Sequence, residues 1–102
     1  MGAVLAGVEK KPLEWVVSAK AALIATMDKI HREDAHTAAL VAQRIEKSLA
    51  TVQSFPLAGT PVKGTRSRSY AVPNTGHSFN YRVTNTTIQV TRWYRQRQNV
   101  LR

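Results

Sequence analysis

Residues 78–91, SFNYRVTNTTIQVT, contain two runs in which apolar and polar side chains alternate. The apolar positions are Phe79, Tyr81 and Val83 in the first run and Ile88 and Val90 in the second. A period of two is typical of β-strands that bury one face. The residues between the runs, Thr84-Asn85-Thr86, suit a tight turn, so the stretch predicts two antiparallel strands.

A third strand is predicted on the N-terminal side of this pair. Residues 67–72 are typical of a strand and end at the turn signal Pro73-Asn74-Thr75-Gly76. The second run of the pair continues into the basic residues 92–98, so the three strands form an antiparallel meander. If helices cover the face with Phe79, the opposite face is polar, basic and open to a partner.

The first half of the chain predicts a short strand and two helices. Residues 12–16 suit an edge strand, and apolar spacings of three and four predict helices over 18–31 and 35–54. Ser18 and Asp34 are the expected N-cap residues. The predicted fold is therefore α+β, with an N-terminal strand, an antiparallel helix hairpin and a three-stranded antiparallel meander.

The length and composition limit the classes that need consideration. The chain has 102 residues, which suits one domain, and 43% of them are hydrophobic, which is enough for a core. Without cysteine there is no disulfide, no Cys-ligated zinc and no thiol nucleophile. No run of 18 apolar residues occurs. We expect a cytoplasmic protein with an N-terminal extension over 1–11 and a single domain over 12–102.

The charge is segregated along the chain. Residues 1–46 hold six basic and six acidic side chains, whereas residues 47–102 hold nine basic side chains and no acidic one. The whole formal charge of +9 therefore lies in the second half, and from Arg66 onward every base is an arginine. Arginine binds carboxylates and phosphates in a planar, bidentate way, so the sequence predicts an anionic partner, either nucleic acid or an acidic protein segment.

Several short motifs follow one another along most of the chain. They are Leu13-Glu14-Trp15, Ala38-Ala39 followed by Arg44-Ile45, Phe55-Pro56-Leu57-Ala58-Gly59, Arg68 followed by Val72-Pro73, Tyr81-Arg82-Val83, and a basic strand end over 92–98. In this order and spacing, residues 13–98 resemble the ParE branch of the RelE/ParE superfamily, the toxins of bacterial type II toxin–antitoxin modules.

The resemblance implies a toxin that inhibits DNA gyrase by binding it, without catalysis and without a cofactor or a metal. It also implies a hetero-oligomer with a ParD-like antitoxin, whose acidic amphipathic segment folds onto the basic sheet face and a groove beside the helix hairpin. The residues expected to bind the antitoxin are Arg66, Arg68 and Arg82. Those expected to bind the target are Arg92, Trp93, Tyr94, Arg95 and Arg97.

A RelE-like, ribosome-dependent mRNA endoribonuclease is the alternative reading. Its catalytic groups would be Arg68, His77, Tyr94 and Arg95, with arginines stabilising phosphate charge and Tyr or His acting as acid or base. The nuclease relatives usually carry an arginine directly after the position of His77, and here that residue is Ser78. This difference favours the ParE branch. A third possibility is a nucleic-acid-binding module without toxicity.

His77 and Trp93 each allow a functional and a structural interpretation. His77 is either an acid or base or a partly exposed residue that flanks a turn. Trp93 either contributes to a binding surface or caps the edge of the sheet. His31 and His36 are five residues apart, which is not the spacing of a helical metal pair, so no metal site is expected.

Overall fold

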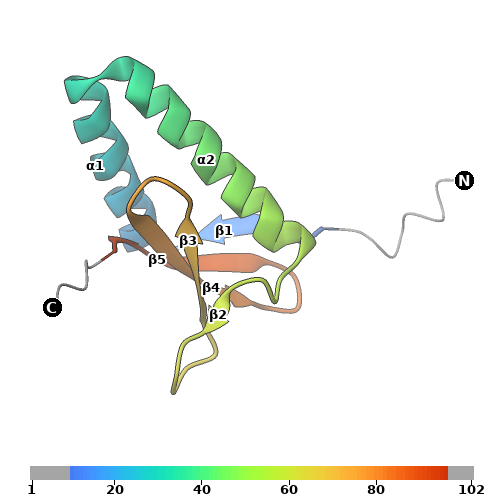
Figure 1. The fold of residues 1–102 in the computed structure, drawn as a ribbon. Helices are drawn as coiled ribbons and strands as arrows, with labels where there is room; N and C mark the ends of the chain where they lie inside the picture. The colour runs from blue at the N-terminus through green and yellow to red at the C-terminus, as the bar shows by residue number, and fades with distance from the viewer. Residues whose placement is uncertain (1–9, 97–102) are drawn as a thin grey trace, which may run out of the picture.

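The computed structural model describes residues 10–96. A five-stranded sheet packs against a hairpin of two long helices (Figure 1). The elements in chain order are β1 (Leu13–Trp15), α1 (Val17–Glu33), α2 (Ala35–Ser54), β2 (Thr60–Pro61), β3 (Arg68–Val72), β4 (His77–Val83) and β5 (Ile88–Arg95). The predicted α+β architecture is confirmed.

The strands lie in the order β1-β5-β4-β3-β2. The meander β3-β4-β5 is antiparallel, as predicted, and β1 pairs with β5 in parallel. The two-residue strand β2 pairs with β3 at the far edge, in a segment for which no strand was predicted. Two residues are too few to show a period, so this strand exists only through its pairing.

The two helix starts differ in how they are capped. Asp34 caps α2 as predicted: its carboxylate accepts hydrogen bonds from the amide of His36 at 3.0 Å and from the Thr37 hydroxyl at 2.9 Å. These bonds, led by that of the Thr37 hydroxyl, lower the pKa of Asp34.

The prediction that Ser18 caps α1 is wrong. The N-cap residue is Val16, and it makes no side-chain capping bond. The Val16 amide still donates to the Val90 carbonyl at 3.0 Å, so the chain passes directly from the end of β1 into the helix. Ser18 consequently lies inside the first turn, two residues after the cap position.

The core lies between the helix hairpin and one face of the sheet. Its buried residues come from both layers: Ala19, Val41, Ile45 and Val52 from the helices, and Val72, Phe79, Tyr81, Ile88, Val90 and Trp93 from the strands. Val83, which the alternation placed on the same face, is 39% exposed because it lies at the end of β4. Neither α1 nor α2 combines the length and apolar character that a bilayer-spanning helix needs.

A β-bulge in β5 changes which side chains face the core. Tyr81 pairs with Val90 but Asn80 pairs with Arg92, so Thr91 is an extra residue in β5. Strict alternation from Val90 would point Arg92 toward the helices and Trp93 away from them. The bulge reverses this order, because one inserted residue exchanges the two faces of everything that follows it.

Lys11 is tied to the folded domain although the sequence analysis assigned it to the extension. Its Nζ donates to the Thr84 carbonyl at 2.7 Å, and its carbonyl accepts from the Gln53 side chain at 2.9 Å. The division of the chain at residue 12 stays a prediction.

Candidate functional site

The face of the sheet opposite the helices, called the open face below, carries Ser69, Asn80, Arg82, Arg92 and Tyr94. Ser69 pairs with Asn80, and Asn80 pairs with Arg92. Residues that pair directly across neighbouring strands point to the same side of a sheet, so these side chains lie next to one another. The predicted polar and basic sheet face therefore exists, and neither helix of the described chain covers it (Figure 1).

Tyr94 organises the middle of the open face. Its Oη donates to the Asn80 side-chain oxygen at 3.0 Å and lies 3.0 Å from the Ser69 hydroxyl. The Arg92 guanidinium lies over the Tyr94 ring, 4.7 Å from its centroid, which is cation–π geometry. These contacts span three strands and hold an arginine and an aromatic ring in fixed positions at the surface.

The arginines of the second half have no acidic partner within the described chain. The one ion pair between residues 10 and 96 joins Arg32 and Asp28 in the first half. Arg66, Arg82, Arg92 and Arg95 are exposed. Their charge is therefore available to an external anion, although the four side chains do not form one contiguous patch.

Arg68 differs from the other arginines because it is bonded within the fold. Its guanidinium donates to the carbonyls of Gly59 at 2.8 Å and Leu57 at 3.3 Å. Beside it, the fully buried Tyr81 donates to the Pro56 carbonyl at 2.7 Å and accepts from the Gly59 amide at 2.8 Å. Burial raises the pKa of Tyr81, so the hydroxyl keeps the proton it donates. Arg68 and Tyr81 together fix the segment between α2 and β2.

Trp93 belongs to the core and not to the exposed surface. It is 5% exposed, and its Nε1 donates to the Thr26 hydroxyl of α1 at 3.0 Å. The His77 ring stacks on it with 5.3 Å between the centroids and 8° between the planes. The His77 Nδ1 lies 3.1 Å from the Thr75 carbonyl, so His77 is held as a turn-flanking residue against the tryptophan.

The structure brings together three of the four residues of the nuclease alternative and leaves Arg68 apart from them. His77 and Arg95 are paired at one end of the sheet, and both line a cleft of about 520 Å³ there, together with Trp93 and Tyr94. The Tyr94 hydroxyl, however, bonds to Asn80 on the open face. Arg68 lies at the opposite end of β3 from Val72, the residue that pairs with His77. Arg97, expected to bind the target, lies outside the described residues.

An apolar groove lies between the two helices of the hairpin. Two hollows of about 400 and 220 Å³ share Leu23 and Met27 in their walls. Ile24, also in the groove, is 58% exposed. A groove beside the hairpin was predicted, but Ile24 was not, because the periodicity of one helix does not show which of its apolar positions the second helix leaves uncovered.

No cluster of three or more His, Cys, Asp or Glu side chains occurs among residues 10–96. The described residues form two surfaces that a partner could contact, namely the open face and the apolar groove.

The fold matches that of a known toxin–antitoxin structure. No family profile and no curated protein sequence matches the chain. Among solved structures, the chain is similar to a chain of the structure described as the chromosomal ParDE TA system from P. aeruginosa, with a TM-score of 0.74 and 24% sequence identity. The alignment covers 86% of this chain and 98% of that one. The chain therefore has the ParE-like α+β fold that its motifs predicted.

Proposed function

We propose that the chain is the toxin of a ParE-type type II toxin–antitoxin pair that acts in the cytoplasm by binding DNA gyrase. The observation that carries this proposal is the match over 86% of the chain to the ParDE structure. The order of the ParE-like motifs in the sequence, from Leu13 to the basic residues 92–98, supports it.

The open face supports binding of a protein target. Arginine and tyrosine are the side chains that most often dominate protein interfaces, and here Arg92 lies over Tyr94 in a cluster that three strands hold in place. Arg95 adds an exposed guanidinium at the end of the same strand. In this proposal Trp93 does not contact the target; it supports the open face by packing β5 against α1.

The apolar groove and the exposed arginines support neutralisation by a ParD-like antitoxin. An amphipathic segment would place its apolar side chains against Leu23, Ile24 and Met27. Its acidic side chains would meet the arginines that have no acidic partner in the described chain, including Arg66 and Arg82. A segment that folds on binding would wrap both surfaces, which gives a hetero-oligomer.

A gyrase assay tests the proposal directly. The purified chain should inhibit supercoiling and accumulate cleaved DNA, and Arg92→Gln should weaken both effects about tenfold, as loss of an interface hot spot does. Lys63→Gln is the matched control, since it removes an equal charge from an exposed loop outside the open face.

Two outcomes would contradict the proposal. One is a folded chain that leaves gyrase unaffected. The other is codon-phased cleavage of translated mRNA, measured by primer extension, that disappears in Arg95→Ala; this result would assign the chain to the ribonuclease branch.

A further inference from the structure

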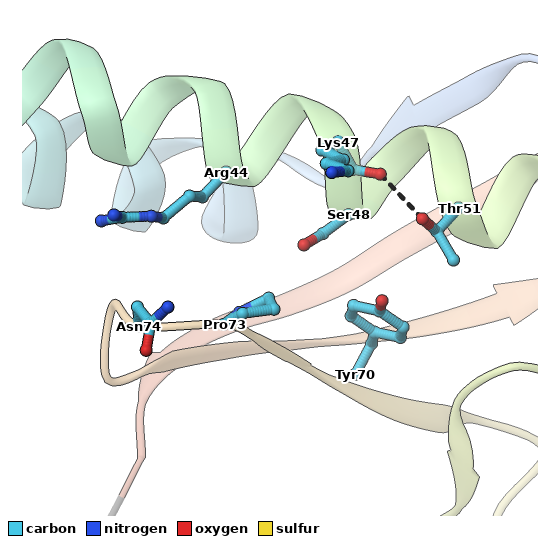
Figure 2. A pocket seen from close by; sticks show the side chains of 7 residues that line it. All are labelled: Arg44, Lys47, Ser48, Thr51, Tyr70, Pro73 and Asn74. Carbon is cyan, nitrogen blue, oxygen red and sulfur yellow. Dashed lines mark hydrogen bonds between the residues drawn. The ribbon is translucent and has the colours of Figure 1, made fainter.

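A basic cleft lies between α2 and the strand β3 with the turn that follows it. It has a volume of about 280 Å³ and belongs neither to the open face nor to the apolar groove. Its lining residues are Arg44, Lys47, Ser48, Thr51, Tyr70, Pro73 and Asn74 (Figure 2). Two of these side chains are cationic, four carry hydroxyl or amide donors, and none is acidic.

Ser48 gives the cleft a polar floor. The residue is 3% exposed, among core positions of α2 that are otherwise apolar. Figure 2 shows its hydroxyl pointing from the helix toward the strand below, and it bonds to no other residue of the described chain. No buried side-chain oxygen among residues 10–96 lacks a partner, so the unbonded Ser48 hydroxyl reaches solvent through the cleft and is free to donate to a group that enters it.

The other donors around Ser48 are equally free. Within residues 10–96, the side chains of Arg44, Lys47, Tyr70 and Asn74 make no ion pair and no hydrogen bond. In Figure 2 the Tyr70 hydroxyl points up toward α2, and the Arg44 side chain extends along the helix above Asn74. Arg44 is half-buried, which reduces the screening of its charge by water. Donors from two layers thus surround one space.

We propose that this cleft binds an aspartate or glutamate side chain of an acidic protein partner. A carboxylate accepts about four hydrogen bonds, and Arg44, Ser48 and Tyr70 supply donors of the matching kind. The Tyr70 ring and Pro73 form an apolar wall for the methylene groups of the entering side chain. A nucleic-acid backbone instead needs a row of cations that follows successive phosphates, and this cleft has two.

The inference concerns the chemistry of the partner and does not depend on the gyrase target. A chain that fails to inhibit gyrase would still be expected to bind a carboxylate here. If the chain is a toxin, the acidic antitoxin is the expected partner.

Amide chemical shifts of the full chain provide the test, with blocked dipeptides as probes. N-acetyl-Leu-Glu-amide should shift the amides of Ser48, Tyr70 and Asn74 in a saturable way, in the millimolar range, at constant ionic strength. The isosteric N-acetyl-Leu-Gln-amide should bind about tenfold more weakly, because it lacks the charge that strengthens each hydrogen bond. Inorganic phosphate is the third probe.

Three variants assign the binding to the cleft. Arg44→Gln should weaken the glutamate dipeptide about tenfold, and Ser48→Ala should weaken it about threefold although every charge remains. Lys63→Gln, which removes a cation from an exposed loop, should leave binding unchanged. Circular dichroism of each variant verifies that the fold is retained.

Several outcomes would overturn the proposal. They are equal responses to the two dipeptides, tighter binding of phosphate than of the glutamate dipeptide, equal weakening by Lys63→Gln and Arg44→Gln, or no saturable shift at these residues. Equal responses to the two dipeptides, or equal weakening by the two charge-removing variants, would indicate non-specific attraction. Tighter binding of phosphate would indicate a phosphate site.

Discussion

Removing one hydroxyl group, by Tyr81→Phe, tests whether the segment after α2 is held in place by that side chain. The hydroxyl makes two hydrogen bonds, to the Pro56 carbonyl at 2.7 Å and from the Gly59 amide at 2.8 Å. Each contributes about 1 kcal/mol net, and a buried amide left unpaired costs about 1–3 kcal/mol. Because Gly59 is buried, we expect the free energy of unfolding to fall by about 2–4 kcal/mol.

Urea denaturation, followed by tryptophan fluorescence, measures this difference at an unchanged m-value. Tyr94→Phe is the matched control, because the Tyr94 hydroxyl contacts two side chains on the half-exposed open face, where water can replace them. We expect the control to cost less than about 1 kcal/mol. Equal costs for the two substitutions, or a Tyr81→Phe protein within about 0.5 kcal/mol of the wild type, would refute the reasoning.

Three further predictions concern stability. Gly59→Ala places a Cβ atom 2.8 Å from the buried Tyr81 side chain, and we expect a loss of about 1–3 kcal/mol in urea denaturation. Asp34→Ala removes the cap of α2 and should lower the Tm, whereas Asp34→Asn keeps a capping oxygen and should retain most of the stability that the cap provides. The Thr37 hydroxyl lowers the pKa of Asp34, so the stability that this carboxylate contributes is present above pH 3.8 and is lost as the pH falls through the lowered pKa. Thermal melts over a pH series should show this loss in the wild type and lack it in Asp34→Ala. Trp93→Phe removes the indole bond to α1 and should cost about 1–2 kcal/mol, measured by thermal melting.

Local sequence patterns predicted the elements because each depends on nearby residues. The alternation in 78–91 became β4 and β5, and the capping prediction at Asp34 was confirmed. Ser18 failed as a cap since the parallel pairing of β1 with β5 sets where α1 begins. That pairing joins residues more than seventy positions apart, so no local propensity reports it.

The allocation of side chains to faces was harder to predict than the strands themselves. The residues from Arg92 to Arg95 were predicted to form one surface, but strand alternation divides them between the two faces of the sheet. The bulge at Thr91 decides that Trp93 faces the core and that Tyr94 lies on the open face. A bulge has no distinct signal in a run of threonine, arginine and tryptophan. Trp93 consequently became a core residue, while Tyr94 beside it became the centre of the open face.

The basic cleft was missed because its two halves are distant in the sequence. Arg44 and Lys47 are three residues apart, a spacing that places them on one side of a helix, and this signal was available. Nothing local indicated that Tyr70 and Asn74 would lie across from them. The same limit applies to Arg68, whose carbonyl partners at Leu57 and Gly59 come from a loop.

The charge segregation, by contrast, can be interpreted from the sequence alone, and the structure explains why. Every acidic residue lies between positions 9 and 46, and the ion pair of the described chain joins Arg32 to Asp28 within that half. Apart from Arg68, the arginines of the described second half (Arg66, Arg82, Arg92 and Arg95) are exposed at the surface, so the fold gains little from them and would lose little without them. Stability therefore does not account for nine bases without one acid, whereas the acidic partner proposed above would account for them.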